Sequence, residues 1–150
     1  MFTKILYPID SFESISLASA QIKEFKQAGT QEMVVLGIIE PGRCAWTGRD
    51  VEQCRADRFE KEKTEIETIL KEMEKDGVKG KVIIEVGAAA HMILKAADEE
   101  EVSLIVIGPG SGKIEGLLLS GATEDVVRHA KVPVLVIKRP AEHITSSREE

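Results

Sequence analysis

The stretch Leu104–Lys138, LIVIGPGSGKIEGLLLSGATEDVVRHAKVPVLVIK, decides the fold of this chain. It opens with an apolar run, Leu104–Ile107, passes through a glycine-rich loop, continues as a helical pattern from Gly121 to Ala130, and closes on a second apolar run, Val132–Ile137. Both runs are apolar on both faces, which is typical of parallel strands covered by helices on each side. The loop follows the carboxyl end of the first run, where open α/β sheets bind ligands. The stretch therefore predicts a strand–loop–helix–strand unit with a candidate ligand site at its loop.

The rest of the chain repeats this alternation. The apolar runs predict strands over Lys4–Ile9, Glu32–Ile39, Lys81–Val86, Val102–Ile107 and Val132–Ile137. Helical spacing predicts helices from Ile15 to a stop near Gly29, over Asp50–Lys75, over Ala89–Glu99 and over Gly121–Ala130. This order predicts an α/β fold, an open five-stranded parallel sheet with helices on both faces. We expect one domain over residues 1–140 and a frayed tail over 141–150.

Three segments give more detailed expectations. Glu40–Arg49 contains a proline and two glycines and is interpreted as a loop. In the helix over Ala89–Glu99, the inward side is expected to be formed by Met92, Ile93, Ala96 and Ala97. In the helix over Asp50–Lys75, one face is marked by Val51, Cys54, Arg58, Glu62, Ile66, Ile69, Leu70 and Met73.

Composition and charge exclude several classes of function. The net charge is −6, and no basic stripe offers a surface for nucleic acid. No apolar run approaches the roughly 18–20 residues that span a bilayer, and the first residues lack the apolar core of a signal peptide. We therefore expect a cytoplasmic protein with no nucleic-acid or membrane partner.

The sequence contains no recognisable metal or catalytic constellation. Cys44 and Cys54 have no CxxC spacing, and the histidines are not placed to complete a metal site. A disulfide is not expected in a reducing compartment. No nucleophile elbow or paired carboxylates are present, so an enzyme is not indicated; the most that the chain would support is slow ATP hydrolysis.

The glycine-rich loop matches neither the dinucleotide-binding fingerprint nor a Walker A loop. Together with KILYPID, VVLGIIEP, VGAAAHMILKAADEE and IG…LLLSGATEDVVRHAKVPVLVIK, it resembles the universal stress protein family over nearly the whole chain. That resemblance implies a Rossmann-like fold of the adenine nucleotide alpha hydrolase-like type, with strand order 3-2-1-4-5. It also implies a homodimer formed through the final strand.

The resemblance implies a site for ATP or another adenine nucleotide, with magnesium only alongside ATP. By position, the acid at the end of the first strand is Asp10, the main chain beside adenine is Ile38 or Ile39, and the phosphate loop is Gly108–Gly121. The candidate site residues are Pro8, Asp10, Ile38, Ile39, Gly108, Gly110, Ser111, Gly112, Lys113, Ser120, Gly121, Ala122 and Thr123. The loop departs from the family pattern G-x2-G-x9-G-[S/T]. Counted back from the final strand, its first interval is one residue short and its last pair is reversed. Counted forward from Gly108, the second glycine becomes Ser111 and the last pair becomes Gly121-Ala122.

Structural roles compete with the functional ones at each candidate. Asp10 and Glu13 fit a capping box for the first helix, and Ser120 with Thr123 suits the N-cap of the last one. The loop glycines could serve only as turns, and Lys113 could be solvated instead of pairing with a phosphate. Trp46 and Arg43 could cover a base or pack on their own loop.

Two functional hypotheses follow. The first is a nucleotide-responsive binding and regulatory module. The second is a dimeric structural or interaction protein in which the altered loop merely closes the fold. The final strand, Val132–Ile137, is long and apolar for an exposed edge, which favours pairing with the same strand of a second copy in either case.

Overall fold

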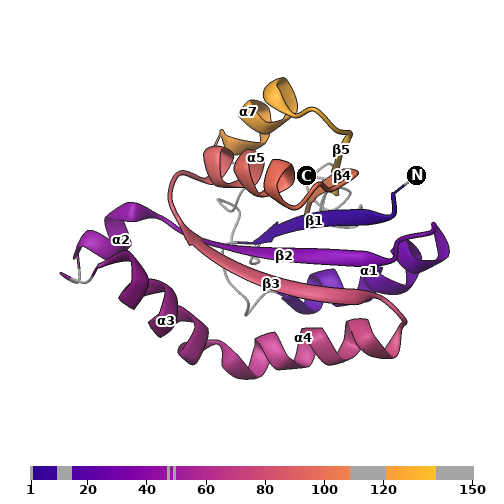
Figure 1. The fold of residues 1–150 in the computed structure, drawn as a ribbon, viewed down its shortest axis with the longest axis horizontal. Helices are drawn as coiled ribbons and strands as arrows, with labels where there is room; N and C mark the ends of the chain where they lie inside the picture. The colour runs from indigo at the N-terminus through magenta and orange to yellow at the C-terminus, as the bar shows by residue number, and fades with distance from the viewer. Residues whose placement is uncertain (1, 10–14, 47, 49, 109–120, 138–150) are drawn as a thin grey trace, which may run out of the picture.

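The structure is a computed structural model and describes residues 2–9, 15–46, 48, 50–108 and 121–137. A parallel five-stranded sheet runs through it in the order β3-β2-β1-β4-β5 (Figure 1). The strands are β1 Lys4–Ile9, β2 Glu32–Ile39, β3 Lys79–Val86, β4 Leu104–Ile107 and β5 Val134–Val136. The predicted fold class and strand order are confirmed.

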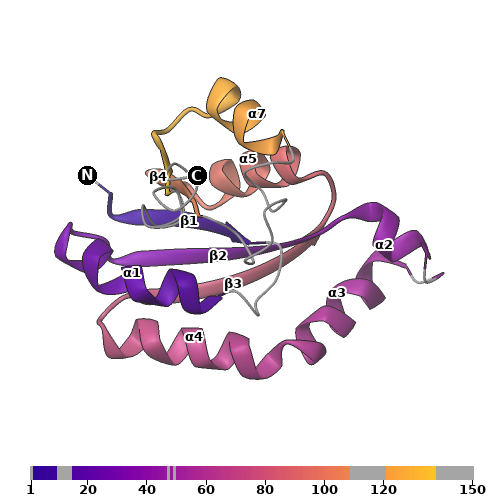
Figure 2. The ribbon, with the colours of Figure 1, turned by 180° about the vertical axis from the view of Figure 1, so that it is seen from behind.

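Helices cover both faces of the sheet, as seen from the two sides in Figures 1 and 2. The helices are α1 Ile15–Gln27, α2 Pro41–Trp46, α3 Val51–Lys61, α4 Lys63–Lys75, α5 Ala89–Glu99 and α7 Ala122–His129. Helices α1 and α4 pack on one face around Ile22, Ile69 and Met73. Helices α5 and α7 pack on the other face around Ile93 and Val126. The strands are apolar on both sides because each side meets a helical layer.

The central pair of strands joins distant parts of the chain. Ile5 of β1 lies opposite Leu104 of β4. Just before β4, the Ser103 N–H donates to the Lys4 carbonyl at 2.8 Å, and the Ser103 hydroxyl donates to the same carbonyl at 3.0 Å. Residues separated by 99 positions therefore close the middle of the sheet.

Several predicted boundaries are confirmed and others move. The strands Lys4–Ile9 and Glu32–Ile39 and the helix Ala89–Glu99 have their predicted bounds. Strand β3 begins two residues early because the Lys79 N–H donates to the Gln31 carbonyl. Strands β4 and β5 are shorter than predicted, and Pro133, which lacks an N–H, directly precedes β5. The predicted inward residues of α5 are all buried.

The segment after β2 differs from the sequence-based expectation. The predicted loop Glu40–Arg49 contains a short helix, α2, which starts at Pro41. Proline suits the first helical position, where its missing N–H would have no helical partner, so the turn signal was misleading. The predicted helix Asp50–Lys75 is divided at Glu62 into α3 and α4. Neither proline nor glycine marks that division, and the periodic pattern runs straight through it.

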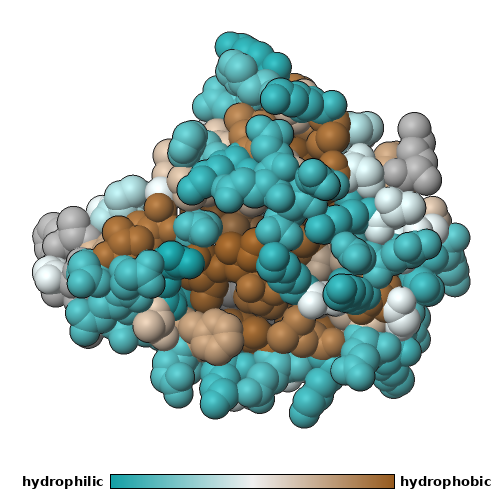
Figure 3. All heavy atoms as spheres, in the orientation of Figure 1, coloured by the Kyte–Doolittle hydropathy of each residue, from teal (hydrophilic) through white to brown (hydrophobic). Residues whose placement is uncertain are grey.

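Most residues of the face that the sequence marks on this long helical region are buried, but the first of them is not. Val51 is 49% exposed at the start of α3, and Phe59 on the same helix is 44% exposed. Figure 3 shows apolar side chains gathered between the α5 layer and the α3 and α4 layer, where edge strand β3 runs, whereas the outer helix surfaces are polar. Val51, the first residue of α3, therefore lies outside the buried part of the face that the sequence marks.

Cys44 and Cys54 form a disulfide, which corrects the expectation that they do not pair. The two Cα atoms are 5.9 Å apart, although ten positions separate the residues in sequence. The expectation rested on the cellular compartment alone. Helix α2, which the sequence did not predict, brings Cys44 against α3. The spacing of the two cysteines in the sequence does not indicate this geometry.

Candidate functional site

The carboxyl ends of β1 and β4 form the place where strand order reverses. The connections from β1 to β2 and from β2 to β3 move one way across the sheet, whereas the chain then crosses to β4 on the other side of β1. In open α/β sheets such a reversal leaves the space beyond the strand ends uncovered by either set of connections, and ligands bind there. The candidate site is therefore described from the residues at this edge.

Gly108 follows β4 directly and lies against Tyr7 of β1. Gly108 is buried, and a Cβ atom built on it would overlap the Tyr7 hydroxyl oxygen and lie 3.0 Å from the Tyr7 Cζ. Tyr7 is itself 3% exposed. Only a residue without a side chain fits here without displacing the tyrosine, so the close approach of β4 to β1 at this edge depends on glycine.

Burial raises the pKa of Tyr7 to about 12, because the charged phenolate loses solvation in the core. A group whose pKa is higher in the folded than in the unfolded protein stabilises the fold below its unfolded pKa of about 10. That contribution is lost as the pH rises from about 10 to 12.

We expect the free energy of unfolding to fall by about 1–2 kcal/mol more in the wild type than in Tyr7→Phe between pH 9.5 and 11.5. Urea unfolding of both proteins across this range measures the difference. The titrating groups that both proteins share contribute equally to the two profiles and therefore cancel in this comparison. Parallel pH profiles for the two proteins would contradict the assignment.

The end of β2 presents backbone groups to both of its neighbours. The Ile39 carbonyl accepts from the Gly87 N–H at 3.0 Å and so faces β3. Successive residues of a strand direct their backbone groups to opposite edges, so the Ile38 carbonyl faces the β1 side. The described ladder between β1 and β2 ends with Ile9 opposite Gly37. Of the two predicted positions, only Ile38 therefore directs its carbonyl toward the β1 side, and it lies one residue past the last described pair of that ladder.

The start of α7 differs from its predicted capping. The N-cap is Gly121, which is exposed, has a φ of 82° and has no side chain of its own to cap the helix. Ser120 was predicted as the N-cap with Thr123 at N3, so the predicted position was one residue too early. Ala122 is buried and Thr123 is half-buried. Glu124 and Asp125 occupy the first turn, where carboxylates favour the helix dipole but oppose a bound anion.

The structure brings together part of the predicted site. Pro8, Ile38, Ile39 and Gly108 lie at the carboxyl ends of three adjacent strands, β1, β2 and β4. The predicted residues outside the described part of the chain are Asp10, Gly110, Ser111, Gly112, Lys113 and Ser120. Tyr7 was not among the predicted residues. Its signal in the sequence is an aromatic hydroxyl within an otherwise aliphatic strand.

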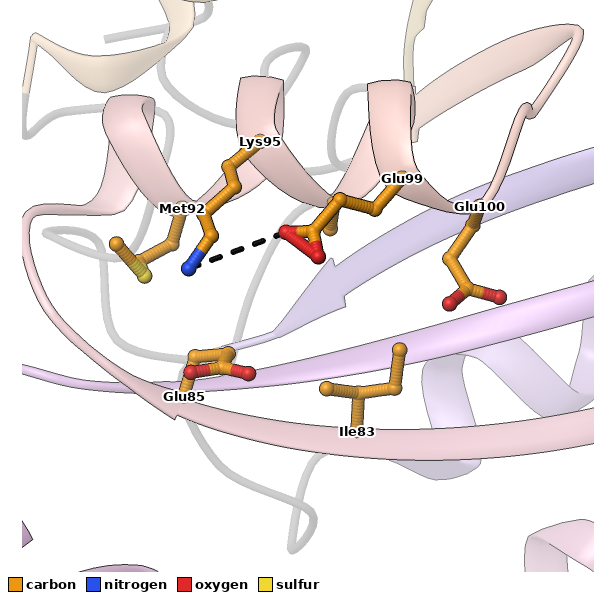
Figure 4. Close-up of a pocket in the computed structure, with 7 residues that line it drawn as sticks. Ile83, Glu85, Met92, Lys95, Glu99 and Glu100 are labelled. Atoms are coloured by element: carbon orange, nitrogen blue, oxygen red, sulfur yellow. Dashed lines mark ion pairs between the residues drawn. The ribbon is translucent and has the colours of Figure 1, made fainter.

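Elsewhere, two small hollows lie on the face that carries α5. One lies between β3 and α5, beside Ile83 and Met92, and the Lys95–Glu99 ion pair of 3.8 Å borders it (Figure 4). The other lies between α5 and α7, beside Ile105 and His129. Each has a volume of about 40 Å³, far below the roughly 300–1,000 Å³ of small-molecule pockets, so neither could enclose a nucleotide.

Two features are absent from the described residues. No cluster of three or more histidine, cysteine or acidic side chains is arranged there to hold a metal ion. Within the same residues, no helix combines the length and apolar character that crossing a membrane requires.

Comparison with known proteins gives a consistent family match. The sequence model of the family described as "Universal stress protein family" matches residues 1–138. The universal stress protein MJ0577 of Methanocaldococcus jannaschii is 33% identical over 156 aligned residues, which cover 93% of this chain and 96% of the relative. A solved structure of MJ0577 has a TM-score of 0.73 and 34% identity, with 93% of this chain and 98% of that chain covered.

More distant structures share the fold. The universal stress protein from Archaeoglobus fulgidus in complex with dAMP has a TM-score of 0.60 and 21% identity, with 92% of this chain and all of that chain covered. A universal stress protein in complex with cAMP has a TM-score of 0.57 and 18% identity, with 91% and 97% covered.

Proposed function

Since this chain belongs to the universal stress protein family, we propose that it is a regulatory module that binds an adenine nucleotide at the carboxyl edge of its sheet. The observation that carries the proposal is the close approach of Gly108 to Tyr7 where the strand order reverses. There the missing side chain lets the chain that leaves β4 pass close to Tyr7 at the end of β1. A phosphate could therefore approach backbone N–H groups in the segment that follows.

The end of β2 supports a place for the base. The Ile38 carbonyl faces the β1 side beyond Ile9, and it could accept a hydrogen bond from the amino group of adenine. Two structures of the same fold hold cAMP and dAMP, so this architecture accommodates an adenine nucleotide. We propose that Asp10 contributes to the adenosine half and that the segment 108–123 receives the phosphates, with magnesium only where ATP is bound.

The proposal is tested by nucleotide retention and titration. Tag-free protein is denatured and released nucleotides are identified by mass spectrometry, and ATP, AMP and GTP are then titrated by calorimetry with and without magnesium. We expect micromolar ATP affinity, GTP binding at least about tenfold weaker, and weaker ATP binding by Asp10→Asn. Equal affinities for AMP and ATP would place the binding energy in the adenosine half.

The proposal would be overturned if the protein retained none of the three nucleotides and bound none of them in the titrations. It would favour the second hypothesis, an interaction protein whose loop only closes the fold. Phosphate release from ATP by the same sample would distinguish a slow hydrolase from a pure binding module.

We also propose a homodimer through β5. Leu135, in the middle of β5, is 43% exposed, and β5 has β4 as its described neighbour in the sheet, with its other edge unpaired among the described residues. Pairing with β5 of a second copy would cover both edges by one symmetric contact.

Leu135→Arg is expected to shift the protein from a dimer toward a monomer, because two opposed arginines would lie at the contact. Light scattering at micromolar concentration measures the mass. The matched control is Val127→Arg, which changes a 55% exposed apolar residue on α7, away from β5. A monomeric wild type, or equal effects of both substitutions, would contradict this interface.

A further inference from the structure

The Cys44–Cys54 disulfide links the segment leaving β2 to α3. Strand β2 ends at Ile39, α2 begins at Pro41, and α3 begins at Val51. Cys44 is 6% exposed and Cys54 is 9% exposed. Among the α2 residues whose side chains the structure describes, Pro41 and Gly42 are exposed and Cys44 is the buried one. The disulfide is therefore a covalent attachment of α2 to the body of the protein.

Helix α3 is the fixed side of this link. Its N-cap, Asp50, accepts a hydrogen bond from the Gln53 N–H at 2.8 Å, and the chain continues through α4, which packs against the sheet around Ile69 and Met73. Figure 1 shows α2 just beyond the end of β2, with α3 running back beneath β3. Holding Cys44 against α3 thus also holds the segment that immediately follows Ile38 and Ile39.

We infer that the Cys44–Cys54 disulfide is a redox-responsive clasp whose reduction releases α2 and weakens nucleotide binding at the end of β2. The reductant is a dithiol. Its thiolate attacks one sulfur, the S–S bond breaks, and a mixed disulfide forms. The second reductant thiolate then displaces the remaining cysteine. Two electrons and two protons pass to Cys44 and Cys54, and the dithiol becomes a disulfide.

The coupling follows from the cost of ordering a released segment. With the bond intact, the chain after Ile39 is constrained before the ligand arrives. With the bond broken, nucleotide binding must also order α2, and the entropy cost of this ordering makes the binding free energy less favourable. The nucleotide part of the inference rests on the proposed function, whereas the release of α2 does not.

The test compares oxidised and reduced protein over a series of reduced-to-oxidised dithiothreitol ratios. Thiol alkylation with peptide mapping measures the fraction of molecules that carry the Cys44–Cys54 bond. Hydrogen exchange measures the protection of the backbone amides in residues 40–50. We expect faster exchange in that segment, a Tm lower by about 5–10 °C, and ATP affinity weaker by about threefold to tenfold upon reduction. The control is Cys44→Ser/Cys54→Ser, which should behave like reduced protein and not respond to dithiothreitol.

The outcomes separate this inference from the proposed function. Absence of the bond in oxidised protein, or unchanged exchange in residues 40–50 upon reduction, would overturn the clasp. Equal ATP affinity in both redox states would overturn its coupling to the site. If oxidised protein binds no nucleotide, the proposed function and the coupling both fail, and the exchange data alone decide whether the clasp exists.

Discussion

Gly108→Ala is expected to lower the free energy of unfolding by about 3 kcal/mol, because the new methyl group would overlap the Tyr7 hydroxyl at a buried contact. Gly108 does not have a positive φ, so the cost is steric and not a backbone strain. Strands β1 and β4 are central to the sheet and have little freedom to separate. Urea unfolding of wild type and variant measures the loss.

Two further variants make this prediction specific. Adding Tyr7→Phe to Gly108→Ala removes the atom that the methyl group meets first, and should restore at least about half of the lost stability. Gly42→Ala is the matched control, since Gly42 lies within α2 with nothing within 4 Å of its would-be Cβ. It should be neutral or slightly stabilising. An equally damaging Gly42→Ala, or no recovery in the double variant, would contradict the steric explanation.

The same double variant separates two roles of Gly108. If it folds stably and binds ATP like the wild type, Gly108 serves packing alone. If it folds stably but does not bind ATP, the missing side chain is also needed by the ligand. A single substitution at Gly108 cannot distinguish these cases because it would damage fold and site together.

The second large effect concerns the junction between α3 and α4. Arg58→Met is expected to cost about 3 kcal/mol of unfolding free energy, because it removes the guanidinium that lies 3.3 Å from a carboxylate oxygen of buried Glu62. The side chains of Arg58 and Glu62 are only 14% and 4% exposed, so water cannot replace the lost partner. Chemical denaturation measures this change.

Arg55→Met is the control for Arg58→Met. Arg55 pairs with Glu52 at 3.0 Å on the same helix, but their side chains are 36% and 83% exposed. Its loss should cost less than about 1 kcal/mol. Combining Arg58→Met with Glu62→Gln should recover part of the stability by removing the buried charge. Similar losses for Arg55→Met and Arg58→Met would show that burial of the Glu62 pair does not matter.

The fold could be predicted from the sequence because its strands are apolar on both faces and alternate with helical patterns. Runs such as Leu104–Ile107 admit few other structures. The errors arose where local signals were ambiguous. Pro41 can end a strand or begin a helix, and the break at Glu62 has no local marker. The disulfide depends on where α2 lies, which is a tertiary property.

The candidate site was predicted less completely. The positions at the ends of β1, β2 and β4 follow from topology, so Pro8, Ile38 and Gly108 could be assigned to one edge. Tyr7 could not, since the approach of its hydroxyl to the side-chain position of Gly108 depends on the register of β1 against β4. The role of Asp10 is a prediction from the family resemblance, and that of Lys113 is a prediction from its positive charge in the glycine-rich loop.

The pairing of β1 with β4 also has a consequence for how the chain folds. The Lys4 carbonyl accepts a hydrogen bond from Ser103, which is synthesised 99 positions later. A nascent chain that has emerged only as far as α5 therefore cannot yet complete its sheet. Until β4 arrives, one edge of β1 has no partner from this sheet, and closing so long a loop slows folding. The incomplete chain is therefore the form most exposed to aggregation, and chaperones that shield apolar strand edges would act on it before the last third of the protein is made.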